Sequence, residues 1–154
     1  MAQSVDINSQ PLINRLQSKV FFLDLNTDDL EIIGVIQFSI GHPTKDKVHD
    51  VISSYRNASN KLHGAYLSNQ LIGVIGFEQT EQKINIRHIS VLPEFRGLGV
   101  GTLLLNHIRT QCEECKIIAE TDMDSVGFYQ KSGFACNPFQ GKHGNLRYSC
   151  ESTT

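Results

Sequence analysis

The sequence carries no excess charge of either sign, with 14 Lys and Arg residues against 16 Asp and Glu residues and a net charge of −2 at pH 7. It therefore lacks the basic surface that is typical of proteins that bind nucleic acid or anionic membranes. It also lacks an apolar run of about 18 residues and a charged-then-apolar leader at its start. We therefore expect a soluble cytoplasmic protein with neither nucleic acid nor a membrane as partner.

The sequence lacks the cysteine spacing of a metal site, although it has four cysteines. Cys112 and Cys115 form a C-x-x-C, whereas Cys136 and Cys150 are far apart, so a second close pair is missing. A redox C-x-x-C lies at the start of a helix, where the dipole lowers the thiol pKa, but this one comes near a helix end. Both of its cysteines also continue the apolar stripe of that helix. We therefore expect no metal and interpret this pair as buried apolar thiols.

Length and composition indicate one domain over residues 1–154. A chain of 154 residues, of which 40% are hydrophobic, can form a single sizeable core and is near the usual size of a domain. Residues 1–17 are polar with no clear pattern, and they suit either a disordered lead or a short extra element.

Hydrophobic periodicity alternates between helical and strand-like along the chain. Two amphipathic helices follow a first strand, although residues 32–38 would also suit a strand. Three strands then form an antiparallel meander, in which Asn69 suits a positive φ at the first turn, and Gly73 and Gly76 indicate bulges or a close approach. A crossover helix next returns the chain to the sheet in parallel, as a right-handed βαβ unit. The expected elements are strands at 19–25, on both sides of 68–70 within 64–79, at 84–91, at 116–121 and twice within 134–151, and helices at 30–40, 44–57, 100–112 and 122–132.

A glycine-rich loop joins the strand at 84–91 to the helix that follows. Pro93 stops the strand, and Arg96 is followed by glycines at the alternate positions 97, 99 and 101. Glycines leave the backbone N–H groups uncovered where a helix begins, and these unpaired donors together with the helix dipole favour an anion. The pattern predicts a phosphate cradle with a fixed positive charge at its rim.

Three kinds of phosphate-binding loop could account for this pattern of glycines. A Walker A loop requires a lysine after its last glycine, and Gly101 is followed by threonine and leucine, so that assignment fails. A dinucleotide fingerprint requires G-x-G-x-x-G directly after the strand, whereas here the spacing is G-x-G-x-G and residues 92–96 intervene. Asp122 could serve as the ribose-binding acid of such a site, so a nicotinamide-binding reductase stays open as the weaker rival, as does an ordinary βα turn.

The third kind of loop is found in a known protein family, which this sequence resembles. The segment VLPEFRGLGVG resembles the central motif of the GNAT superfamily of acyl-CoA-dependent N-acyltransferases, with Arg96, Gly99 and Gly101 at the motif positions. Residues 121–134, TDMDSVGFYQKSGF, resemble the later motif of the family, a short helix with an aromatic pair ending in tyrosine. The resemblance covers about residues 66–134.

The resemblance implies a fold and an activity. The family has an α/β fold of the α+β type, in which helices cover both faces of a mixed, mostly antiparallel sheet of about seven strands. The fourth and fifth strands splay apart to hold acetyl-CoA as co-substrate, without a metal. The acetyl group passes by direct attack, in a ternary complex, to a primary amine of a small molecule or peptide, and a backbone N–H near Val91 would bind the oxyanion. The resemblance implies coenzyme contacts at Ile89, Val91, Arg96, Gly97, Leu98, Gly99, Val100, Gly101 and Thr102.

Tyr129 is the candidate general acid. It occupies the tyrosine position of the later motif, and a phenol with a pKa near 10 is protonated at neutral pH, so it can donate to the departing thiolate. Core packing is the alternative for this side chain. Phe128 beside it is interpreted as core.

His88 is the candidate base. Many family members carry a glutamate on the fourth strand, and here His88 is the titratable group of the neutral range on that strand. By alternation it would share a face with Ile86 and Ser90, where a packed histidine is the alternative interpretation. Glu78 and Glu120 are further candidates acting through water.

A non-catalytic acyl-CoA sensor remains the alternative function, because the fourth strand lacks the glutamate. The sequence does not identify the amine acceptor. Pairing with a second copy of the chain also stays open.

Overall fold

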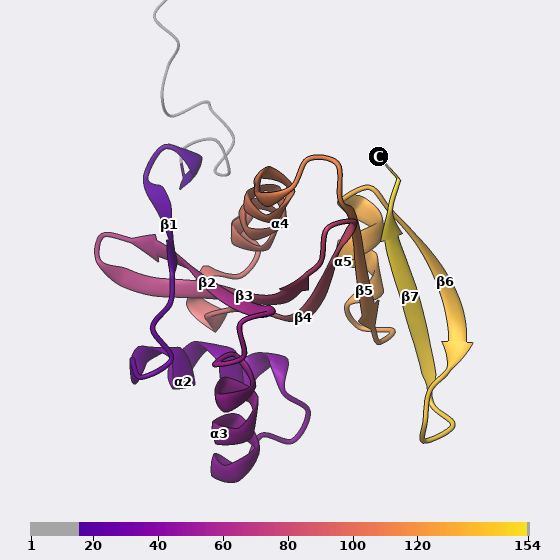
Figure 1. Ribbon diagram of the computed structural model, residues 1–154, viewed down its shortest axis with the longest axis horizontal. Coiled ribbons are helices and arrows are strands. Elements are labelled where there is room, and N and C mark those ends of the chain that lie inside the picture. Colours follow the sequence, from indigo (N-terminus) through magenta and orange to yellow (C-terminus); the bar gives the residue numbers. More distant parts are fainter. Residues whose placement is uncertain (1–15, 154) are drawn as a thin grey trace, which may run out of the picture.

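The computed structural model describes residues 16–153, so the prediction for residues 1–17 falls almost entirely outside the described part of the chain. Seven strands form one sheet in the order β1-β2-β3-β4-β5-β7-β6 (Figure 1). Neighbouring strands are antiparallel except β4 and β5, which are parallel, as the βαβ pattern predicts. The strands are β1 (Val20–Asp24), β2 (Asn60–Leu67), β3 (Gln70–Gln79), β4 (Lys83–Val91), β5 (Lys116–Thr121), β6 (Phe134–Gln140) and β7 (Leu146–Ser152).

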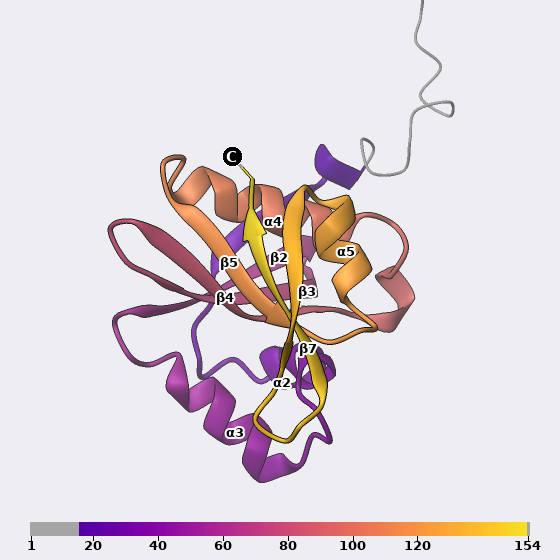
Figure 2. The same cartoon turned by 90° about the vertical axis from the view of Figure 1, so that its right-hand side faces the viewer.

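Helices cover both faces of the sheet (Figure 1 and Figure 2). One face carries α2 (Glu31–Ile36), continued by the 3-10 turn η2 (Gln37–Ser39), and α3 (Lys45–Ser54). The other face carries α4 (Val100–Gln111), which follows the 3-10 turn η3 (Pro93–Phe95), and α5 (Val126–Lys131). Across residues 16–153 no helix has the length and apolar character needed to cross a membrane.

The helix boundaries show where local sequence signals act. The Thr44 hydroxyl accepts a hydrogen bond from the Lys47 N–H at 3.2 Å and so caps the start of α3. The helix expected over 122–132 begins only at Val126, because Asp122 accepts from the Ser125 N–H at 3.0 Å and holds these residues in a turn. Residues 32–38, which also suited a strand, are helical.

The β2–β3 hairpin is confirmed, with φ of 49° at Ser68 and 68° at Asn69, the positive values that a tight hairpin turn requires. Beyond the turn, Ile72 is an extra residue in the register, so Gly73 lies beside a bulge. A Cβ on Gly73 would lie 3.1 Å from the Leu104 side chain, so the glycine also allows α4 to approach closely.

The sheet opens between β4 and β5. The two strands pair only from Lys83–Lys116 to Ile86–Ala119, so the last five residues of β4 have no partner on that side. A bulge lies at the same point, because Gly76 pairs with His88 and Phe77 with Ile86, which leaves Arg87 extra. Since a bulge bends the strand that carries it, β4 turns away from β5 here. The splay implied by the family resemblance is therefore present.

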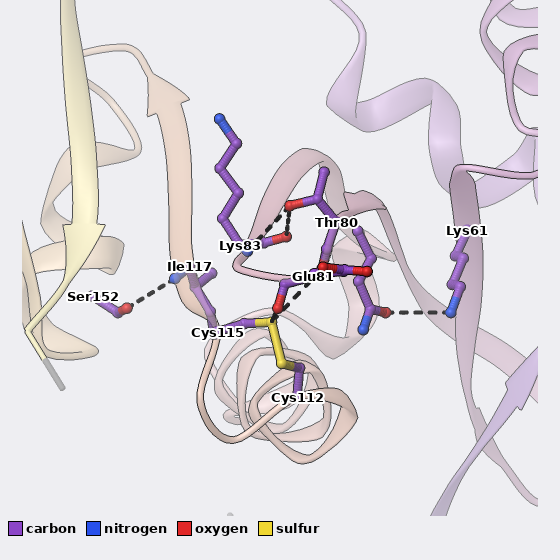
Figure 3. The surroundings of a disulfide bond; sticks show 9 residues. Lys61, Thr80, Glu81, Lys83, Cys112, Cys115, Ile117 and Ser152 are labelled. Atoms are coloured by element: carbon purple, nitrogen blue, oxygen red, sulfur yellow. Dashed lines mark hydrogen bonds between the residues drawn. A yellow bond between two sulfur atoms is a disulfide. The ribbon is translucent and has the colours of Figure 1, made fainter.

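The cysteines form two disulfides, Cys112 with Cys115 and Cys136 with Cys150, so the interpretation of the C-x-x-C as free thiols is wrong. The short connection from α4 to β5 brings the first pair to a Cα–Cα distance of 5.3 Å, with Cys115 against the β3–β4 turn (Figure 3). The second pair lies face to face in the register of β6 and β7. In the described part of the chain, no three or more metal-ligating side chains gather at one place.

Two histidines meet between the sheet and α4. His63 Nδ1 of β2 and His107 Nε2 of α4 are 2.9 Å apart. The Phe22 ring stacks on His107 with centroids 4.3 Å apart, and the Phe77 ring lies edge-on to His63. Burial lowers the pKa of both imidazoles, and the pKa of His107 is lowered further by His63. Both rings are therefore neutral at pH 7, and one N–H donates to the other ring.

Because the pKa values of His63 and His107 are lowered in the folded protein, we predict that its free energy of unfolding decreases as the pH falls. In the unfolded chain a histidine titrates near pH 6.5, above its folded pKa here, so below that pH the unfolded state binds more protons. The contribution is complete above about pH 6.5 and is lost on acidification. We expect the melting temperature to fall between pH 7 and pH 5, and His107→Gln to flatten that slope relative to His49→Gln, a control on the exposed surface of α3. An unchanged slope in His107→Gln would assign the acid sensitivity to other groups.

Candidate coenzyme and acyl-transfer site

The glycine loop presents unpaired backbone donors at the open end of the sheet. Gly97 and Gly99 have φ of 76° and 93°, in the left-handed region that favours glycine, and Gly99 is the N-cap of α4. The first helical hydrogen bond runs from the Leu103 N–H to the Gly99 carbonyl at 3.0 Å. The six N–H groups of residues 97–102 donate to no other residue within 16–153. Unpaired donors of this kind, together with the dipole of α4, favour an anion.

Arg96 lies at the rim of this loop. Its side chain is exposed, and its Nε donates to the Val91 carbonyl at 3.2 Å. Its guanidinium carbon lies 5.2 Å from the ring centroid of Phe38 in η2, within the range of a cation–π contact. The positive charge is thus held between the end of β4 and the α2 side of the molecule, beside the free N–H groups.

Gly101 connects this loop to α5. A Cβ on Gly101 would lie only 3.0 Å from the Phe128 ring, so the missing side chain allows α5 to pack on the first turn of α4. Phe128, interpreted from the sequence as core, is half-buried at this contact. The next residue, Tyr129, belongs to the same core cluster as Val100 and Leu104 of α4.

Tyr129 is buried, with 3% of its surface exposed, between the rings of Phe128 and Phe134. Burial raises the pKa of its phenol to about 12, so the hydroxyl is protonated at neutral pH. Within the described residues that hydroxyl makes no hydrogen bond. A protonated donor without a protein partner is therefore available on the α4–α5 face.

The opening between β4 and β5 beyond Ile86 and Ala119, called the split below, is lined on one side by the unpaired edge of β4. The Leu92 N–H donates to the Ile72 carbonyl of β3 at 2.9 Å. The N–H and C=O groups of successive residues in an antiparallel strand point in alternating directions. Those of Ile89 and Val91 therefore point away from β3, into the opening between β4 and β5. This edge can pair with an extended ligand that carries amide groups.

His88 lies on the opposite face from Tyr129. The expectation that it shares a face with Ile86 is wrong, because the extra residue Arg87 shifts the alternation: Ile86 packs in the α4–α5 core, whereas His88 faces α3. It does share its face with Ser90, whose hydroxyl donates to the Val35 carbonyl at 2.5 Å. His88 Nδ1 lies 2.5 Å from the Tyr55 hydroxyl.

Burial and a neighbouring positive charge keep His88 neutral. Burial first, and then the positive charge of Arg87, lower the pKa of His88 to about 4. Glu78, a further candidate base from the sequence, is paired with Arg87 at 3.4 Å. Glu120, the other candidate, is exposed on β5.

Sequence reasoning did not single out Tyr55 as part of this site. Its phenol, 6% exposed, lies over Gly76, where a Cβ would come within 2.0 Å of the hydroxyl oxygen. The signal available in the sequence was the glycine inside a strand, which indicated a close approach without naming the partner.

A separate cavity of about 470 Å³ lies between α2 and α3. Its lining includes Ile33, Lys45 and His49, and none of its lining residues belongs to β4, the glycine loop or α5. It is therefore distinct from the split between β4 and β5.

A mixed sheet that opens between a parallel pair of strands, with a glycine-rich helix start at the opening, is the arrangement that the resemblance to acyl-CoA-dependent N-acyltransferases implies. Residues 42–147 match the family model described as an acetyltransferase (GNAT) domain. The chain belongs to the GNAT family of acetyltransferases.

Individual relatives are distant in sequence. Over 81 residues the chain is 27% identical to N-alpha-acetyltransferase 50 of Danio rerio, a match that spans 46% of this chain and about half, 48%, of that protein. A GNAT family acetyltransferase of Elizabethkingia anophelis with acetyl-CoA bound has a TM-score of 0.68 at 18% identity, over 87% of this chain and 97% of that one. Naa50 of Arabidopsis thaliana, in complex with the bisubstrate analogue CoA-Ac-MVNAL, has a TM-score of 0.65 at 19% identity, over 88% and 99%. At these identities the two structures support the fold.

Proposed function

We propose that residues 1–154 form one domain that transfers the acetyl group of acetyl-CoA to a primary amine of a small molecule or peptide. The observation that carries the proposal is the set of six N–H groups at residues 97–102, which donate to no residue within 16–153 and lie where β4 and β5 part. The pyrophosphate of the coenzyme fits this anion site, with Arg96 at its rim. The pantetheine arm then pairs with the free edge of β4 at Ile89 and Val91.

The geometry supports direct transfer. The amine nitrogen attacks the thioester carbonyl and a C–N bond forms, the C–S bond then breaks, and coenzyme A leaves as a thiolate that needs a proton. We propose that the Tyr129 hydroxyl supplies this proton or a hydrogen bond, since it is protonated and lacks a protein partner. A backbone N–H near Val91 is proposed as the donor to the oxyanion.

The attacking amine must also lose a proton, and His88 is the residue that we propose on the acceptor side. It lies on the face of β4 opposite Tyr129, so the two side chains flank a coenzyme held in the split. As a base it would need a ring nitrogen with a free lone pair facing the amine. Its contact with Tyr55 decides whether it has one.

The acceptor class remains wide. N-alpha-acetyltransferase 50 is named for acetylation of an α-amine, and the analogue bound to the Arabidopsis structure carries a peptide portion. These support a peptide amine as one candidate beside a small-molecule amine. The cytoplasmic location expected from the sequence is not part of this proposal. Thiols in the cytosol are kept reduced, whereas the four cysteines of this chain form two disulfides.

A non-catalytic acyl-CoA sensor is the second candidate, favoured by the absence of a carboxylate on β4 within Lys83–Val91. Incubating the protein with acetyl-CoA and a pool of amines and peptides separates the two. Amine-dependent release of free thiol supports the enzyme, whereas coenzyme binding without release supports the sensor.

We expect coenzyme A to stabilise the folded protein. At a concentration 100 times the dissociation constant, linkage supplies about 2.7 kcal/mol, which raises the melting temperature of a domain of this size by a few degrees. Pantetheine, which lacks the pyrophosphate, should give a much smaller shift. Equal shifts from both ligands, or none from millimolar acetyl-CoA, would contradict the placement of the pyrophosphate on the glycine loop.

A further inference from the structure

Tyr55 and His88 form a buried contact that the transfer mechanism above does not explain. Tyr55 lies at the C-cap of α3, and its hydroxyl reaches across the sheet face to His88 Nδ1 at 2.5 Å. Gly76, the partner of His88 on β3, leaves the space that the phenol fills. Within residues 16–153, the hydroxyl has no other hydrogen-bond partner, and neither has the His88 ring.

The hydrogen bond between the Tyr55 hydroxyl and His88 Nδ1 can run in either of two directions. If Nδ1–H donated to Tyr55, the phenol proton would have no acceptor among the described residues at a site that is 6% exposed. An unpaired buried donor costs about 1–3 kcal/mol. If instead Tyr55 donates to Nδ1, the phenol is satisfied and the imidazole keeps its hydrogen on Nε2. The second arrangement leaves only the Nε2–H of the half-buried His88 without a partner among the described residues, instead of the phenol hydrogen of the more deeply buried Tyr55.

We infer that Tyr55 is a positioning residue that holds His88 in the Nε2–H tautomer, so that His88 offers a hydrogen-bond donor and not a lone pair to the acceptor side of the split. This inference rests on the proposed function for its consequence in catalysis. His88 then orients the acceptor or the oxyanion by donation, and the proton of the attacking amine leaves to water.

The electrostatic surroundings are consistent with this role. Burial raises the pKa of Tyr55 well above its usual value, so the phenol remains a donor throughout the working pH range. Tyr55 of α3 contacts His88, and Arg87 on the same strand, which is paired with Glu78 of β3, acts on it electrostatically. The neighbouring charge is positive, which disfavours an imidazolium ion.

The tautomer can be measured without any assay of activity. We propose nitrogen NMR of protein labelled with ¹⁵N-histidine, with the His88 signals assigned by their loss in His88→Gln. We expect a pyridine-like Nδ1 and a pyrrole-like Nε2 in the native protein, and a shift toward the other tautomer in Tyr55→Phe but not in Tyr148→Phe. Gly76→Ala, which displaces the phenol without removing it, is the second variant if Tyr55→Phe does not fold.

Activity then separates the donor role from the base role. The Gln amide can present an N–H near the position of Nε2, whereas the shorter Asn amide cannot. We expect His88→Gln to keep kcat within about fivefold and His88→Asn to lose about 10-fold or more, with acetyl-CoA affinity unchanged in both. A pyrrole-like Nδ1 in the native protein, or a loss of about 100-fold in a folded His88→Gln that binds coenzyme, would overturn the inference. If no amine is acetylated at all, the proposed function fails while the NMR measurement still decides the tautomer.

Discussion

Tyr129→Phe should lower the maximal rate by roughly 10²-fold or more while acetyl-CoA affinity and melting temperature stay nearly unchanged. The substitution keeps the ring that packs between Phe128 and Phe134 and removes only the hydroxyl. Because that hydroxyl has no protein partner among residues 16–153, its loss leaves no buried group unpaired. The effect should therefore appear in the chemical step, where coenzyme A departs.

The measurement requires conditions in which chemistry limits the rate, such as single-turnover acetyl transfer with enzyme in excess. Tyr148→Phe, which removes a phenol from half-buried β7, is the matched control and should behave as the native protein does. A Tyr129→Phe enzyme that keeps its maximal rate within about threefold would show that this tyrosine only packs.

Gly99→Asp should abolish coenzyme binding. Gly99 caps α4 with a φ of 93°, so any side chain there adds strain, and a carboxylate adds a negative charge where the pyrophosphate must approach the free N–H groups. Gly99→Asn carries nearly the same shape and tolerates the left-handed conformation, so it separates charge from strain.

Isothermal titration of both variants with coenzyme A measures the difference. We expect Gly99→Asn to bind weakly and Gly99→Asp to show no binding at millimolar ligand, with melting temperatures of the free proteins close to each other. Gly133→Asp places the same side chain at a φ of 89° after α5, away from the loop, and should bind normally. A folded Gly99→Asp that binds as the native protein does would remove the anion site from the glycine loop.

Much of this architecture follows from local chemistry. Consecutive positive φ angles at Ser68 and Asn69, the threonine cap of α3 and the left-handed Gly97 and Gly99 each depend on a few neighbouring residues. Such features are legible in the chain because their energies do not involve distant partners. The order of elements, the parallel βαβ unit and the glycine loop were predictable for this reason.

The disulfides and the face of His88 were not predictable in this way. Cys136 and Cys150 pair because the register of β6 and β7 places them opposite each other. The bulge at Arg87 is specified by pairing with β3, so strict alternation assigned His88 to the wrong face relative to Ile86. In each case the deciding interaction joins residues that are distant in sequence.

The Tyr55–His88 contact shows the same division between local pattern and tertiary packing. Tyr55 lies at helical spacing from the apolar residues Val48 and Ile52, and Gly76 indicated that some group comes close to β3. Only the packing of α3 on the sheet brings the phenol, the glycine and the imidazole together, 33 residues apart along the chain for the hydrogen-bonded pair. Residue types and short spacings thus determined the glycine loop and the family, whereas the protonation chemistry that we propose for His88 depends on which distant side chains the fold brings into contact.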